Sequence, residues 1–223
     1  MNLISLTQTR NLFDMLTQIK EMHREQKFEE ALVLTEKALR SEALFSSKDP
    51  GDARIHFLYC KAVALDILGK VEEAFHIFEK LVNDYPGTPE FESSIQIICA
   101  KLQDEAKVLI KEDLNHPKIL ETLTRLERHT MPPYWLLHAV AAREISEGKV
   151  EVGLKRIQNV LALSPNDSDY LRCAISLAQS CGRNHEAHKM LDHARELLEE
   201  RPYRFDLLRL LEDEVLTEEK LMS

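Results

Sequence analysis

Apolar residues recur at intervals of three and four along most of the chain, which is the pattern of amphipathic helices. The clearest case lies at residues 58–86, where two such stripes follow each other across Gly69. The stripes consist of Leu58, Ala62, Leu65, Ala74, Phe78 and Leu81. Gly69 stands where a helix can end in a left-handed cap, and Pro86 would stop the second helix. The pattern therefore predicts a helical hairpin.

The same layout returns twice further along the chain. Gly148 precedes Pro165 by the same interval of 17 residues that separates Gly69 from Pro86. Gly182 follows Gly148 after 34 residues and again stands between two apolar stripes. Equal intervals of this kind indicate a repeated helix–turn–helix unit, in which neighbouring units bury each other's apolar faces.

A helix–turn–helix period of about 34 residues resembles the tetratricopeptide repeat family. The residues that carry the resemblance fall into four roles. They are small residues at the helix crossing (Ala62, Ala74, Ala141, Gly153, Ala187), turn glycines (Gly69, Gly148, Gly182), bulky packing residues (Phe78, Ile157, Leu191) and closing prolines (Pro86, Pro165). The resemblance implies an all-α fold, a right-handed superhelical solenoid of helical hairpins with a C-terminal capping helix.

The repeats are expected near residues 12–45, 55–88, 134–167 and 168–201 of a single solenoid over 1–223. In the first unit Gln26 stands where the later units have a turn glycine. Residues 88–132 are irregular, because Gly69 and Gly148 lie 79 residues apart where two periods would span about 68. This stretch predicts two helices, which form either a degenerate repeat or a spacer and hinge between two halves.

The last segment, residues 203–222, predicts a helix that covers the final repeat. Phe205, Leu208, Leu211 and Val215 form the stripe expected to face the core. Leu207, Leu210 and Leu221 make the helix apolar over a wider arc. Self-association into a homo-oligomer through this helix is therefore the alternative.

Composition limits the classes of protein that the chain can represent. With 6 Gly and 8 Pro in 223 residues, it lacks the turn residues of an all-β fold. No apolar stretch reaches the roughly 18 residues of a membrane span, and the first residues do not read as a secretory signal. The net charge of -9 disfavours nucleic acid as a partner. We expect a cytoplasmic protein with no membrane contact.

Side chains that could carry chemistry do not form a known motif. His185 and His188 are three residues apart, so they miss the four-residue spacing of a zinc protease helix. No C-x-x-C pair and no glycine-rich phosphate loop occurs, and the four cysteines read as free thiols. We expect no enzyme activity, no metal and no cofactor, and a metal-dependent hydrolase is a remote alternative.

In tetratricopeptide arrays the first helix of each unit lines the concave face, where an extended peptide or a helix binds. Carried over position by position, the resemblance implies a partner-binding surface. Its residues would be Lys20, His23, His56, Tyr59, Val63, Asp66, Trp135, His138, Ala142, Ile145, Arg172, Ser176 and Gln179. Tyr59, Trp135 and Arg172 are the residue types that most often dominate binding energy. Tyr59 could equally be half core, and Trp135 could simply fix the start of its helix.

Some family members hold the carboxylate terminus of a chaperone with paired Lys, Asn and Arg residues. Leu16, Lys20, Tyr59 and Val63 stand at the corresponding positions here, so a clamp of that kind is not expected. The function indicated is a non-enzymatic adaptor or scaffold that holds a peptide or helix of a partner protein. The alternatives are a chaperone for a secreted or assembly-prone partner and a self-associating scaffold.

Overall fold

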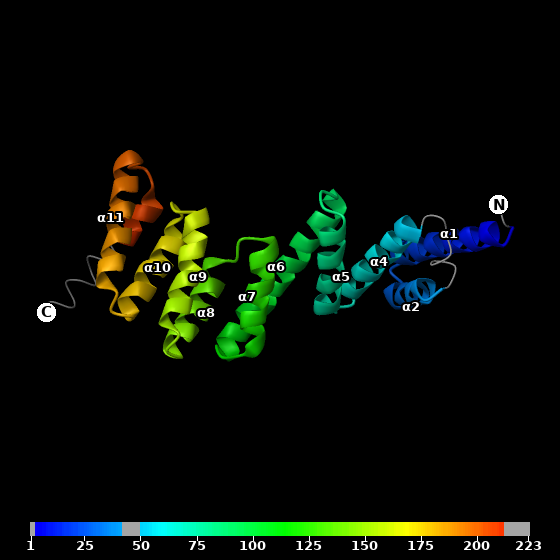
Figure 1. The fold of residues 1–223 in the computed structure, drawn as a ribbon, viewed down its shortest axis with the longest axis horizontal. Helices are drawn as coiled ribbons and strands as arrows, with labels where there is room; N and C mark the ends of the chain where they lie inside the picture. The colour runs from blue at the N-terminus through cyan, green and yellow to red at the C-terminus, as the bar shows by residue number, and fades with distance from the viewer. Residues whose placement is uncertain (1–2, 42–49, 212–223) are drawn as a thin grey trace. The chain divides into compact units, whose positions relative to one another are not determined.

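The structure is a computed structural model that describes residues 3–41 and 50–211 (Figure 1). These residues form helices and connecting turns, and no strand occurs among them. The helices are α1 (Leu3–Arg24), α2 (Phe28–Leu39), α4 (Pro50–Ile67), α5 (Val71–Asp84), α6 (Pro89–Glu112), α7 (Pro117–His129), α8 (Tyr134–Ser146), α9 (Val150–Leu163), α10 (Ser168–Ser180) and α11 (Asn184–Glu200). The predicted all-α fold of successive helical hairpins is confirmed.

The chain divides into two compact units, residues 1–102 and 103–223. The boundary between Leu102 and Gln103 falls inside α6, within the irregular segment 88–132. Both helices predicted for that segment are present, as α6 and α7. Whether they form a degenerate repeat or a spacer stays a prediction, as does the single solenoid, and the two units are described separately below.

In the first unit, α1 packs on α2, α2 on α4 and α4 on α5, so the hairpins contact each other in chain order. Ala62 on α4 and Ala74 on α5 are fully buried, as expected of small residues where two helix axes cross. Phe57 and Phe75 are fully buried as well and supply large apolar side chains to the core. Burying each such ring stabilises the fold by about 1.5–3 kcal/mol relative to leaving it in water.

The turns inside the hairpins have the predicted left-handed backbone. Gly69, Gly148 and Gly182 have φ values of 76°, 81° and 70°, a region that costs a residue with a side chain about 1–2 kcal/mol. Gln26 occupies the same region, with a φ of 61°, at the first turn. The first hairpin therefore makes the same turn as the others, although its residue is not glycine.

In the second unit, α8 packs on α9 and α10 on α11. A Cβ atom added to Gly153 on α9 would lie only 2.7 Å from the carbonyl oxygen of Ala141 and 2.9 Å from Cγ1 of Ile145 on α8. The glycine thus permits a closer approach of these two helices than a residue with a side chain would allow. Ala187 on α11, which has the same role in its hairpin, is buried.

The residues after α11 correct the predicted core-facing stripe. Residues 205–211 are helical, but Leu207 and Leu210 are buried against α10 and α11, whereas 76% of Phe205 is exposed and Leu208 also faces solvent. Leucines at 207, 210 and 211 also have helical spacing, so periodicity alone did not fix the rotation of the helix. Val215 and the rest of the predicted capping helix lie outside the described residues.

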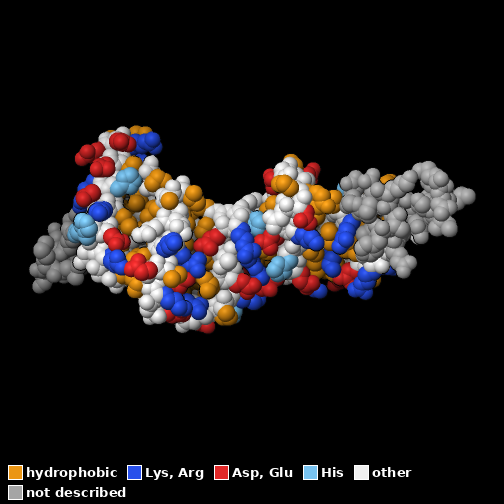
Figure 2. Space-filling view, viewed as in Figure 1, with side chains coloured by type: hydrophobic (Ala, Val, Ile, Leu, Met, Phe, Trp, Pro, Cys, Tyr) orange, Lys and Arg blue, Asp and Glu red, His pale blue; other side chains and the backbone are white. Residues whose placement is uncertain are grey.

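Acidic and basic side chains alternate over the visible surface of both units (Figure 2). Many form short-range ion pairs, such as Arg24 with Glu21 at 2.8 Å and Arg195 with Asp192 at 2.7 Å. These pairs are more than half exposed and contribute about 0–1 kcal/mol each. Within the described residues, no helix combines the length and the apolar character needed to cross a membrane.

Candidate partner-binding site

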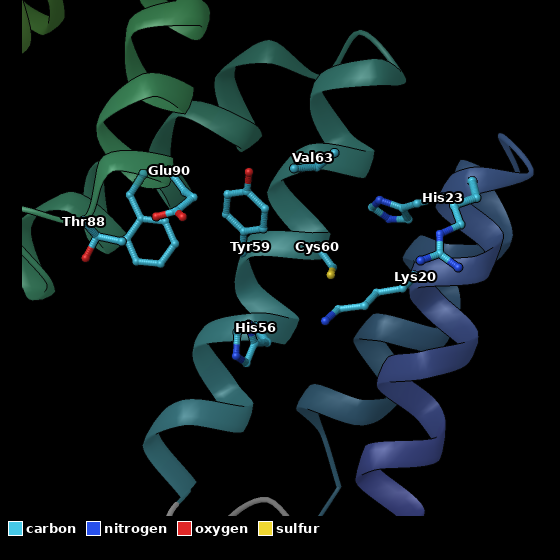
Figure 3. Close-up of a pocket in the computed structure, with 10 residues that line it drawn as sticks. Lys20, His23, His56, Tyr59, Cys60, Val63, Thr88 and Glu90 are labelled. Atoms are coloured by element: carbon cyan, nitrogen blue, oxygen red, sulfur yellow. The ribbon is translucent and has the colours of Figure 1, made fainter.

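In the first unit, five of the predicted partner-binding residues line a single hollow of about 620 Å³ (Figure 3). We call it the N-terminal groove. Its lining consists of Lys20, His23, Arg24, His56, Tyr59, Cys60, Val63, Thr88, Glu90 and Phe91. Lys20 and His23 share a face of α1, and His56, Tyr59 and Val63 share a face of α4, because residues three and four apart lie side by side on a helix.

Three segments surround the groove. Figure 3 shows Lys20 and His23 reaching from α1 toward α4, with Thr88 and Glu90 on the opposite side. Thr88 directly precedes α6, and Glu90 and Phe91 lie in its first turn. Sequence reasoning missed these residues, because it left the role of residues 88–132 open. Reading α6 as the first helix of another unit would have placed its face beside that of α4.

The floor of the groove is aromatic. The Tyr59 ring lies 5.9 Å from the Phe78 ring, edge to face, and 5.7 Å from the Phe91 ring, measured between centroids. Its hydroxyl lies 3.5 Å from the Ser94 hydroxyl oxygen. Tyr59 is half-buried, so it contributes to the core with one part of its ring and to the groove with the rest. Its position is therefore compatible with both predictions for this residue, core packing and partner binding.

His23 carries an unusual nitrogen. Among the described residues, its Nε2 is the buried side-chain polar atom that has no hydrogen-bond partner. The imidazole packs edge-on against the Phe28 ring at 5.5 Å, and burial lowers the pKa of His23. Nearby, burial raises the pKa of the Cys60 thiol, an effect that the Lys20 ammonium opposes. The thiol therefore stays protonated near neutral pH and supplies no negative charge to the groove.

Asp66 does not line the groove. Its carboxylate accepts a hydrogen bond of 2.5 Å from the Lys101 ammonium, and the Asp66 side chain is only 16% exposed. This ion pair links α4 to α6 within the first unit. The partner of Asp66 lies 35 residues along the chain, so sequence spacing alone did not reveal it.

In the second unit, four predicted residues meet in a smaller hollow of about 280 Å³. We call it the C-terminal hollow. It is lined by Tyr134, Trp135, His138, Arg172, Cys173 and Ser176, from α8 and α10. Burial lowers the pKa of His138 and raises the pKa of the Cys173 thiol to about 12. Trp135 is half-buried in the first turn of α8, a position compatible with both of its interpretations.

Three further predicted residues are not part of this lining. Ile145 lies beside Gly153 at the crossing of α8 and α9, and both Ala142 and Gln179 are half-buried elsewhere on their helices. A hydrogen bond from the Tyr170 hydroxyl to the Pro132 carbonyl oxygen, 2.6 Å long, fixes α10 to the segment that leads into α8. The C-terminal hollow therefore rests on an anchored pair of helices.

A third hollow, of about 360 Å³, is lined mainly by the second helices of the last two hairpins, α9 and α11, with Pro165 and Leu171 between them in the chain. Leu161 on α9 and Met190 and His193 on α11 are among its lining residues. Sequence reasoning did not reveal it, because the resemblance directs attention to first helices. His185 and His188 are exposed, and the described residues contain no group of three or more His, Cys, Asp or Glu side chains that could hold a metal ion.

No family model matches the chain, and no curated protein matches it in sequence. Solved structures of tetratricopeptide repeat proteins resemble it over most of its length. TTC0263, a thermophilic tetratricopeptide repeat protein of Thermus thermophilus, is 21% identical, covers 92% of this chain and 99% of its own, and has a TM-score of 0.36.

Two other solved structures give similar figures. YrrB, described as a tetratricopeptide repeat protein with an unusual peptide-binding site, is 15% identical over 87% of this chain and 89% of its own, with a TM-score of 0.32. MamA from Desulfovibrio magneticus RS-1 is 15% identical over 85% of this chain and 96% of its own, with a TM-score of 0.35. At these identities the resemblance concerns the fold alone.

Proposed function

We propose that the protein is a non-enzymatic, cytoplasmic adaptor that binds a segment of a partner protein in the N-terminal groove. The observation that carries the proposal is the convergence of Lys20, His23, His56, Tyr59 and Val63 on one hollow. Its volume of about 620 Å³ lies in the range of roughly 300–1,000 Å³ that is usual for binding pockets.

The groove has the composition of a binding surface. Tyr59, Val63 and Phe91 form an apolar and aromatic floor, and polar side chains stand at the rims. The Tyr59 ring packs on two other rings, those of Phe78 and Phe91, so little side-chain entropy remains to be lost when a ligand contacts it. A pre-formed apolar floor with a polar rim favours binding of an extended segment or of one face of a helix.

Two matched substitutions test the proposal. Val63→Arg places a long charged side chain in the groove, whereas Val33→Arg makes the same change on α2, where Val33 is 70% exposed and outside the lining. Affinity capture from the native organism, with quantitative mass spectrometry, would compare both variants with the unchanged chain. We expect at least one partner protein to be captured by the unchanged chain and by Val33→Arg but not by Val63→Arg. Circular dichroism should show the same helicity for both variants and the unchanged chain.

Equal capture of every protein by the two variants would exclude the N-terminal groove as the binding site. Tyr59→Phe serves as a second control, because it keeps the ring and removes only the hydroxyl, and it should retain the partner. Co-expression then separates an adaptor from a chaperone. The partner of an adaptor stays soluble when it is produced alone, whereas the client of a chaperone does not.

A further inference from the structure

The N-terminal groove carries a charge opposite to that of the whole chain. Two cations, Lys20 and Arg24, line it together with the imidazoles of His23 and His56, and Glu90 is the carboxylate among its lining residues. The chain as a whole has a net charge of -9. Local positive charge in a negatively charged protein indicates a site that attracts an anionic group to one place.

Several of these nitrogen atoms lack a partner. No described residue forms an ion pair with Lys20 or His56, and the Nε2 atom of His23 has no hydrogen bond. Arg24 differs, because its guanidinium already pairs with Glu21 at 2.8 Å. The His23 Nε2 atom is inaccessible to solvent, whereas Lys20 and His56 are exposed, so Lys20 supplies an unpaired ammonium that a ligand in the groove can contact.

The unpartnered groups are close together in the fold. Lys20 and His23 lie three residues apart on α1, and both side chains point toward α4 (Figure 3). The apolar floor made by Tyr59 and Val63 begins directly beside them. An acceptor that contacts Lys20 would therefore hold its neighbouring side chain against that floor.

We propose that the N-terminal groove selects protein segments in which an aspartate or glutamate adjoins a large apolar residue. The carboxylate accepts a hydrogen bond from the Lys20 ammonium, and the apolar side chain packs on Tyr59 and Val63, beside the His23 imidazole. This inference rests on the proposed function, which it narrows to one class of partner segment. A side-chain carboxylate can make this contact, so the partner segment needs no free chain terminus.

A nucleic acid is disfavoured as the source of the anion. A nucleic acid strand carries a charge at every nucleotide, so it would extend its phosphates over an acidic protein surface. A peptide segment brings one or two carboxylates to the cationic wall and can be neutral elsewhere. The apolar floor also matches a Leu or Phe side chain, which a phosphate backbone lacks.

The test uses the full chain and fluorescein-labelled peptides of about twelve residues. One peptide has a Leu–Phe pair flanked by glutamates, a second has glutamines in place of the glutamates, and a third has serines in place of the apolar pair. A labelled single-stranded oligonucleotide of about twelve nucleotides completes the set. Fluorescence anisotropy gives the dissociation constant of each probe.

We expect the first peptide to bind about tenfold or more tightly than the glutamine peptide, the loss expected for one charge-assisted hydrogen bond. Lys20→Glu should weaken its binding by a similar factor. The control is Lys80→Glu, which makes the same charge change at an exposed position on α5 outside the lining, and it should alter affinity less than twofold.

The possible failures can be told apart. Equal binding of the glutamate and glutamine peptides, both abolished by Val63→Arg, would overturn the acidic preference and leave the groove as the binding site. Lack of binding by every peptide at about 1 mM would overturn both proposals. Tighter binding of the oligonucleotide, or an equal effect of Lys20→Glu and Lys80→Glu, would also overturn the acidic preference.

Discussion

Gly153→Ala tests whether the approach of α8 and α9 depends on the absence of a side chain. The added Cβ would lie 2.7 Å from the Ala141 carbonyl oxygen, about 0.7 Å short of the 3.4 Å at which ordinary contact begins. It would also lie 2.9 Å from Cγ1 of Ile145. A side chain can rotate away from such a contact, but a backbone carbonyl cannot, so the helices must move apart.

The magnitude follows from two opposing effects. Overpacking a buried position costs about 1–3 kcal/mol, and a contact with backbone favours the upper half of that range. Alanine in place of glycine inside a helix returns about 0.5–1 kcal/mol. We therefore expect Gly153→Ala to lower the free energy of unfolding of the second unit by about 1–2.5 kcal/mol.

Urea unfolding measures this change directly. Trp135 is the only tryptophan of the chain and lies on α8, so its fluorescence reports on the hairpin that contains Gly153. Lys155 is exposed on α9, so the difference in stability between Lys155→Gly and Lys155→Ala measures what alanine gains over glycine in this helix without any change in packing. If Gly153→Ala stabilised the protein by that same gain, the close-approach argument would be wrong.

Three further predictions use the same unfolding measurement. Glu144→Ala removes the carboxylate that the partly buried Arg156 guanidinium contacts at 2.8 and 3.0 Å and leaves it only the longer contact of 3.3 Å with Glu127, so it should cost about 1–3 kcal/mol. Arg156→Ala combined with Glu144→Ala should cost less than the sum of the single changes. Gln26→Gly removes a side chain from a left-handed turn and should stabilise the first unit by about 0.5–1 kcal/mol, and destabilisation would contradict that reading. Burial lowers the pKa of His138 below its ordinary 6.5, so the unfolded chain binds a proton at this residue first as pH falls. The free energy of unfolding should therefore decrease below about pH 6.5, and His138→Gln should flatten this part of the profile. An unchanged slope in the variant would exclude His138 as the cause of the pH dependence.

Features with local causes could be read from the sequence. The turn glycines Gly69, Gly148 and Gly182 mark points where the backbone takes a positive φ, a requirement that one residue meets by itself. Small residues at helix crossings, such as Ala62 and Ala74, follow from the sterics of one hairpin. Helix spacing likewise predicted which residues of α1 and α4 share a face, and five of them meet in the N-terminal groove.

Features that depend on contacts between distant segments required the tertiary structure. Glu90 and Phe91, at the start of α6, form the third side of the groove. The Asp66 carboxylate on α4 forms an ion pair with Lys101, which also lies on α6. The face of the last helical segment was also undetermined, because Leu207 and Leu208 lie about 100° apart on the helix and either could face the core. Packing against α10 and α11 buries Leu207. The sequence by itself determined the hairpins and their repeat, since these arise within about 34 residues. Only the packing of one hairpin on the next decided which side chains share a groove and which nitrogen atoms there lack a partner.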